Sequence, residues 1–97
     1  MNYLDEIGEC ALLENLAEEC CELAQAALKL SRIKRKENPT PKTEKEAVLD
    51  LVEEIADVQL MLESYLPYKH WQPGIAVVKE KKRKRWERRI EELAYTE

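Results

Sequence analysis

Residues 16–26 read LAEECCELAQA and contain two carboxylates three positions apart, Glu19 and Glu22. Because an α-helix turns by about 100° per residue, both carboxylates project from one side of a helix with neighbouring tips. That side lies just beside an apolar stripe whose members alternate three and four positions apart. The predicted stripe consists of Leu13, Leu16, Cys20, Leu23, Ala27 and Leu30. We therefore expect Glu19 and Glu22 at the edge of a helix–helix contact.

Residues 51–58, LVEEIADV, repeat this arrangement with Glu54 and Asp57. Here too the carboxylates lie just beside an apolar stripe, and the displacement has the same sense as in the first helix. The predicted stripe consists of Val48, Leu51, Ile55, Val58, Leu62 and Leu66. If the two stripes pack on each other, four carboxylates meet at the edge of the seam.

Four carboxylates held close together and half out of water disfavour one another's ionisation. A hard divalent cation with oxygen ligands relieves that repulsion, so the pattern favours a metal site. The alternative is that all four are ordinary solvated helix residues, since 37% of the chain is charged and such spacings are common in helices. The matching position on two helices favours the metal site.

The spacing predicts a first helix over about residues 9–36, ended by the sequence NPTP at 38–41. Thr43 with Glu46 forms a capping box that opens a second helix, which ends at about Leu66 before a proline. The short, stiff connection predicts that the second helix folds back antiparallel to the first. A turn is expected over residues 67–74.

A last helix is expected from Pro73, which suits a first helical turn, to about Tyr95. Its residues 79–89 carry eight Lys and Arg and two Glu, a local charge of +6 in a chain of net charge −4. Some of these cations fall within the helix's own apolar face, where charges are costly unless they are paired. That face consists of Ile75, Val78, Trp86, Ile90 and Leu93.

The second helix is apolar on two faces, so it needs two packing partners. One partner is the first helix, and the other is expected to be a second subunit, giving a homodimer or homotetramer. The second face consists of Leu49, Val52, Ala56 and Leu60.

A length of 97 residues fits one domain with a small core. We predict an all-α fold, an antiparallel bundle of three to four helices per chain, completed by oligomerisation. No apolar run reaches the roughly 18 residues of a membrane span, so no membrane partner is expected. Three cysteines, two of them adjacent, indicate a reducing, cytoplasmic setting, with Cys20 as a small core residue. With glycine only at Gly8 and Gly74, a P-loop is excluded.

Residues 16–26 and 51–58, with the NPTP connection at 38–41, resemble the MazG-like family in its short, single-domain, phage-type form. These proteins are all-α nucleoside triphosphate pyrophosphohydrolases. The likeness covers roughly residues 12–90 and implies a single MazG-like helical domain over residues 1–97. It implies that Mg²⁺, with Mn²⁺ as a substitute, is held by Glu19, Glu22, Glu54 and Asp57.

The resemblance also implies that cations of the last helix bind substrate phosphates. Lys82, Arg85 and Arg89 match the family pattern, and Lys79 matches it less closely. The alternative is that these residues neutralise the acidic first two helices. Asn15 and Asp50, one turn before the carboxylate motifs, and Trp71 are candidates for nucleoside contacts or, for the first two, for supporting the metal ligands.

The function that follows is Mg²⁺-dependent cleavage of a nucleoside triphosphate to a monophosphate and pyrophosphate. A carboxylate that is not fully committed to metal takes the proton of the attacking water, and Glu19 is the candidate. Two alternatives stay open: a nucleic-acid-binding helical protein that uses residues 79–89, and a non-enzymatic helical adaptor. The acidic remainder of the chain argues against nucleic acid as the partner.

Overall fold

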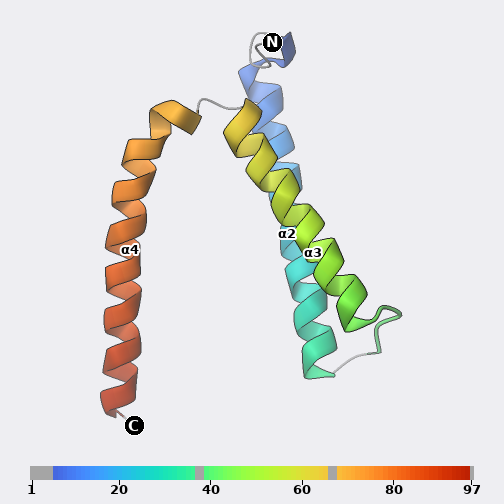
Figure 1. Ribbon diagram of the computed structural model, residues 1–97, viewed down its shortest axis with the longest axis vertical. Coiled ribbons are helices and arrows are strands. Elements are labelled where there is room, and N and C mark those ends of the chain that lie inside the picture. Colours follow the sequence, from blue (N-terminus) through green and yellow to red (C-terminus); the bar gives the residue numbers. More distant parts are fainter. Residues whose placement is uncertain (1–5, 37–38, 66–67, 97) are drawn as a thin grey trace. The chain divides into compact units, whose positions relative to one another are not determined.

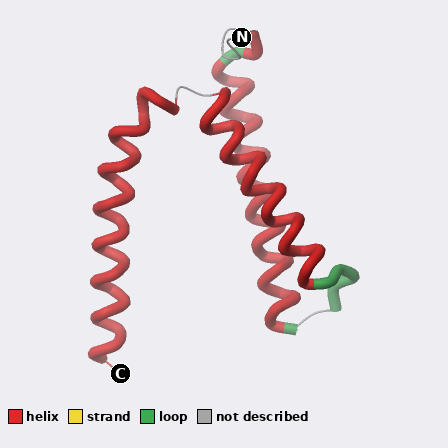
Figure 2. Tube along the Cα trace, in the orientation of Figure 1, coloured by secondary structure: helices red, strands yellow, loops and turns green. Residues whose placement is uncertain are grey.

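The computed structural model describes residues 6–36, 39–65 and 68–96, and every regular element in these ranges is helical (Figure 2). The all-α prediction is therefore confirmed. The elements are α2 (Glu9–Arg35), α3 (Glu44–Leu60), the π-helix η1 (Met61–Tyr65) and α4 (Tyr68–Thr96). The chain forms two compact units, Met1–Leu66 and Pro67–Glu97, and each is described by itself.

α2 begins directly after Gly8, whose backbone φ of 95° favours glycine. Its C-terminal cap is Lys36, in the left-handed conformation with φ of 58°. The N–H of Lys36 donates to the carbonyl oxygens of Arg32 and Ile33 at 3.0 and 3.3 Å, which satisfies carbonyls that the helix end leaves open. The bounds predicted for the first helix are confirmed.

The capping box that opens α3 is present as predicted. Thr43 Oγ1 accepts a hydrogen bond from the Glu46 N–H at 3.1 Å, and Glu46 Oε1 accepts one from the Thr43 N–H at 3.2 Å. An ion pair of 3.0 Å between Lys34 and Glu44 joins the end of α2 to the start of α3. The predicted helix end at Leu66 and the proline after it lie outside the described residues.

α2 and α3 pack side by side as an antiparallel helical hairpin (Figure 1). Leu12 and Met61 form the centre of its core, and Leu16 and Leu62 pack against them. Ala47, 1% exposed, is the other buried apolar residue among those described. With so few buried side chains, the hairpin leaves much of its apolar surface uncovered.

The contact face of each helix is rotated from the predicted stripe toward the carboxylate flank. On α2 the half-buried or buried positions run through Leu12, Leu16, Glu19, Leu23, Ala26 and Leu30. On α3 and the first residue of η1 they run through Ala47, Asp50, Leu51, Glu54, Val58 and Met61. The carboxylates Glu19 and Glu54 therefore lie in the seam itself and not at its edge.

This rotation corrects part of the predicted core. Cys20 is exposed, so its assignment as a core residue is wrong. Leu13, Val48 and Ile55 are exposed as well, at 43%, 39% and 39%. The physical reason is that the seam takes in the carboxylate flank, which leaves the opposite half of each stripe outside it.

α4 begins at Tyr68, so the turn predicted over residues 67–74 is wrong for its described part. Pro73 lies inside the helix, where its missing N–H removes one backbone hydrogen bond. Among the described residues, no helix is both long enough and apolar enough to span a bilayer.

Candidate metal and phosphate sites

The hairpin brings three carboxylates together near the middle of its seam. Glu19 and Glu22 from α2 and Glu54 from α3 each offer an oxygen, and these oxygens lie within 4.8 Å of one another. Two trans ligands of one Mg²⁺ are about 4.2 Å apart, twice the Mg–O distance. The spacing of the three oxygens is therefore close to the spacing that the ligands of one ion require.

Asp57, the fourth predicted ligand, stands outside this group of three among the described residues. It is half-buried, and its charge raises the pKa of both Glu19 and Glu54. Asp57 therefore lies within electrostatic reach of the cluster. The predicted pairs Glu19–Glu22 and Glu54–Asp57 thus meet across the seam, and three of the four acids bring oxygens within 4.8 Å of one another.

Burial first, and then neighbouring charge, disfavours ionisation of Glu19 and Glu54 and raises the pKa of each. Desolvation raises the pKa of Glu19, and the charges of Glu22 and Asp57 raise it further. Desolvation likewise raises the pKa of Glu54, with Glu22 the largest of the charge contributions. A bound cation reverses the second effect, because an opposite charge favours the ionised carboxylate.

Two oxygens of the cluster are buried and have no hydrogen-bond partner among the described residues, Glu19 Oε2 and Glu54 Oε2. A buried polar atom without a partner costs stability, and most such atoms in proteins bind something. These residues fit a divalent cation, because carboxylate oxygen is the ligand that Mg²⁺ and Mn²⁺ prefer.

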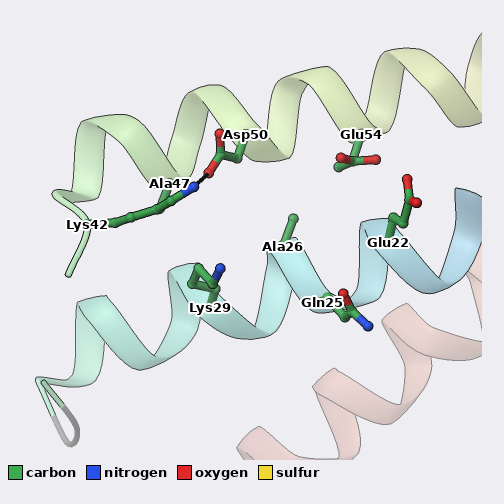
Figure 3. A pocket seen from close by; sticks show the side chains of 8 residues that line it. All are labelled: Glu22, Gln25, Ala26, Lys29, Lys42, Ala47, Asp50 and Glu54. Atoms are coloured by element: carbon green, nitrogen blue, oxygen red, sulfur yellow. Dashed lines mark hydrogen bonds and ion pairs between the residues drawn. The ribbon is translucent and has the colours of Figure 1, made fainter. Parts of the chain in front are cut away.

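A groove of about 290 Å³ continues from the cluster along the seam (Figure 3). Glu22 and Glu54 face each other at one end, and Ala26 lies between the helices beyond them. At the far end Lys42 forms an ion pair with Asp50, which raises the pKa of Lys42.

The residues predicted to contact the nucleoside lie on three different helices. Asp50 lines the groove and is held by Lys42. Asn15 is exposed on α2, one turn before Glu19. Trp71 belongs to α4, in the other compact unit, and is 43% exposed.

Two lysines of the groove, Lys29 and Lys42, were missed by the sequence reasoning. Lys29 continues the carboxylate flank of α2, at the three- and four-residue spacing that links Glu19, Glu22 and Ala26. Extending that flank by one more turn would have found it. Lys42 precedes the capping box, and only the folded chain shows that it reaches Asp50.

The predicted phosphate-binding cations lie together on one side of α4. They line a hollow of about 460 Å³, formed by Lys79, Lys82, Arg83, Arg85, Trp86 and Arg89. The positions follow from the helix repeat, since residues three, four and seven apart share a face. Of the six, Arg83 is paired, with Glu80 at 2.8 Å.

Lys79, Lys82, Arg85 and Arg89 form no ion pair within the described part of α4. Their like charges repel one another, and a bound anion would relieve that repulsion. The hollow therefore attracts anions. Phosphate groups fit this arrangement, because Arg and Lys donate charge-assisted hydrogen bonds to phosphate oxygens.

No family model matches the sequence, and neither a curated protein nor a solved structure is significantly similar to the chain.

Proposed function

We propose that the protein is a Mg²⁺-dependent nucleoside triphosphate pyrophosphohydrolase of the MazG-like kind, acting as a cytoplasmic enzyme of nucleotide metabolism. The observation that carries the proposal is the meeting of Glu19, Glu22 and Glu54 from two helices, with two buried oxygens that lack a partner. Carboxylates used only for solubility have no reason to lose water and crowd together in a seam.

In this proposal Glu19, Glu22, Glu54 and Asp57 hold the cation. When bound, Mg²⁺ offsets triphosphate charge and polarises the attacked phosphorus. Water attacks the α-phosphorus, the bond from that phosphorus to the bridging oxygen breaks, and pyrophosphate leaves.

Glu19 is the proposed acceptor of the water proton. Burial and neighbouring acids raise its pKa, which makes it a stronger base than an exposed glutamate once it is ionised.

The cations of α4 complete the proposed enzyme by holding the phosphates. Lys79, Lys82, Arg85 and Arg89 offset charge that builds up on the leaving pyrophosphate. This part of the proposal requires the helices to form one bundle, in which α4 approaches the hairpin.

We further propose that the bundle is completed by a homodimer or homotetramer. Leu49, Val52 and Leu60 are 59%, 56% and 50% exposed on the outer side of α3, and Ala56 is exposed beside them. Burying such a face stabilises association by roughly 25 cal/mol per Å² of apolar surface. Sedimentation at micromolar concentration tests this, and a stable monomer would contradict it.

The activity is tested by measuring pyrophosphate release from a panel of canonical and modified deoxynucleoside triphosphates, with Mg²⁺ and with a chelator. The proposal expects metal-dependent release of pyrophosphate and a monophosphate from at least one of them. Absence of release from every triphosphate, or release of single phosphate instead, would contradict it.

A nucleic-acid interface is the second candidate function, because residues 79–89 carry a local charge of +6. Binding through them would weaken steeply with salt. The experiments with Mg²⁺ and with a chelator also distinguish an adaptor from the enzyme, because an adaptor requires no cation.

A further inference from the structure

Taken by itself, α4 carries a row of cations that is longer than one triphosphate. Lys79 and Arg89 are ten residues apart, which is about 15 Å along the helix axis. The phosphates of a triphosphate share bridging oxygens, so a single triphosphate covers only part of that length. A polymer with a phosphate in every unit would cover all of it.

The cations of this row are not committed to acids of the protein. Four of those that line the hollow form no ion pair among the described residues, namely Lys79, Lys82, Arg85 and Arg89. A nucleic-acid strand carries one phosphate per about 3.4 Å in a duplex, and fewer per length when it is extended. The row therefore faces up to about four phosphates, which matches its four unpaired cations.

An exposed aromatic ring lies among these cations. Trp86 lines the same hollow and is 66% exposed. Lys82 comes four residues before it and Arg89 three residues after it, so both project from the side of the helix that carries Trp86. A nucleobase stacked on the indole would bury apolar surface that is now in water. Such stacking suits a strand of any sequence, because every base has a π-face.

The acids of α4 distinguish a single strand from a duplex. Glu80, Glu87 and Glu91 lie about 100° to 140° around the helix from Trp86, and none of them lines the hollow. A helix in the groove of a duplex has phosphates on both sides, so these acids would face like charge. The bases of a duplex are also stacked on one another and leave no free face for Trp86. A single strand contacts one side of the helix and offers both phosphates and free bases.

We propose that the hollow on α4 binds a single strand of nucleic acid, with its four unpaired cations on successive phosphates and a base stacked on Trp86. The inference goes beyond the pyrophosphohydrolase and specifies the second candidate function. A strand and a triphosphate would share Arg85 and Arg89, so the two ligands exclude each other on this face.

The test is the binding of a short, fluorescein-labelled oligothymidine to the full chain, followed by fluorescence anisotropy over a range of salt concentrations. The same oligonucleotide paired with oligoadenine is the duplex probe. Trp86→Leu removes the ring and keeps an apolar helix former, and Arg89→Ala removes one cation. Lys84→Ala is the matched control, since Lys84 is exposed and does not line the hollow. Circular dichroism confirms that each variant keeps its helices.

The unmodified chain should bind the single strand more tightly than the duplex. A plot of log Kd against log salt should have a slope of about 3, from about 0.7 for each of four phosphates. Trp86→Leu should weaken binding about tenfold at an unchanged slope, because one base stack is lost. Arg89→Ala should lower the slope by about 0.7, and Lys84→Ala should change affinity and slope much less.

Absence of binding to the strand, or tighter binding to the duplex, would overturn the proposal. So would an unchanged affinity in Trp86→Leu, or a loss in Lys84→Ala as large as that in Trp86→Leu. Binding to phosphatidylserine-containing vesicles without binding to the strand would overturn it as well, and would assign the face to an anionic lipid surface.

The two proposals fail separately. Strand binding that Trp86→Leu weakens, without hydrolysis of any triphosphate, would reject the pyrophosphohydrolase and keep the strand site. Metal-dependent hydrolysis by a protein that binds no strand would keep the enzyme and reject the strand site.

Discussion

In the hairpin of α2 and α3 the charged residues that meet come from two helices, whereas in α4 they come from one. Glu19 and Glu54 are brought together by packing across a seam, and the Oε2 atom of each is buried there without a hydrogen-bond partner among the described residues. Lys82 and Arg89 are aligned by the helix repeat alone and stay exposed. The charge cluster therefore lowers the folding stability of the hairpin, whereas the exposed cations of α4 have no such cost. A cluster that costs stability needs a compensating ligand more than one that is solvated.

Removing a carboxylate from the seam is the strongest test of the difference between the hairpin and α4. Glu54→Gln keeps the shape of the side chain but removes one negative ligand. We expect turnover of triphosphates to fall by about a hundredfold or more, as for the loss of other preorganised electrostatic groups. The melting temperature without metal should stay equal or rise, because like-charge repulsion in the seam falls.

Glu53→Gln is the control, since Glu53 is exposed in the same turn of α3. It should change neither turnover nor melting temperature appreciably. If Glu54→Gln instead lowered the metal-free melting temperature and left turnover intact, Glu54 would be a structural residue.

The second prediction addresses α4. Arg89→Ala removes a cation that has no ion pair within the described part of its helix. If it holds phosphate, kcat/KM for triphosphates should fall about 10- to 100-fold, the range for a charge-assisted hydrogen bond. Stability should change little, because no native ion pair on α4 is broken.

Lys84→Ala is the matched control, because Lys84 lies 4.0 Å from Glu80 in an exposed pair of small energetic value. Turnover and melting temperature should both stay near those of the unmodified protein. Normal turnover in a destabilised Arg89→Ala protein would reject phosphate binding by Arg89.

These two regions also differ in how far the sequence predicts them. The α4 face follows from the helix repeat, so the positions of Lys79, Lys82, Arg85 and Arg89 needed no knowledge of packing. The same repeat located Glu19, Glu22 and Glu54 on matching flanks, and the capping box at Thr43 was readable from its spacing alone.

The helix repeat alone does not predict how each helix is rotated against its neighbour. A shift of the contact face by part of a turn moved Cys20 out of the core and Glu19 into the seam. The competition between an apolar stripe and its polar flank depends on interhelical packing, which no single helix encodes. The ion pair of Lys42 with Asp50 was hidden for a different reason, because the geometry of the loop before α3 sets it. The prediction that Pro73 opens the last helix was wrong, because Pro73 lies inside α4.

The third prediction concerns the joint between the two helices of the hairpin. Thr43→Ala removes the side-chain oxygen that accepts from the Glu46 N–H. We expect a loss of about 1 kcal/mol in the free energy of unfolding, measured with urea. Thr43→Ser retains the hydroxyl and should lose much less. An equal loss in both variants would mean that the methyl group, and not the cap, carries the effect.

The fourth prediction is a pH dependence of the stability of the hairpin. The pKa values of Glu19 and Glu54 are raised above their ordinary value of 4.5, so the folded protein binds these protons more tightly than the unfolded chain. This stabilisation is fully present below pH 4.5 and is lost as pH rises through the folded-state pKa. Metal-free stability should therefore decline over that window.

The double variant Glu19→Gln, Glu54→Gln should show a flatter pH profile in the same urea titrations, because neither side chain titrates. Saturating Mg²⁺ should remove the decline in the unmodified protein, because the cation favours the ionised acids and binds more tightly as they lose their protons. Identical profiles for the two proteins without metal would contradict the assignment of the raised pKa values.

The most direct test is divalent-cation binding by isothermal titration calorimetry at neutral pH, comparing the unmodified chain with Glu54→Gln. The account predicts saturable binding of Mn²⁺ and Mg²⁺ to the unmodified protein, a matching rise in melting temperature, and the loss of both in Glu54→Gln. Equal responses from the two proteins, or none from the unmodified chain, would contradict the claim that the seam carboxylates form a metal site.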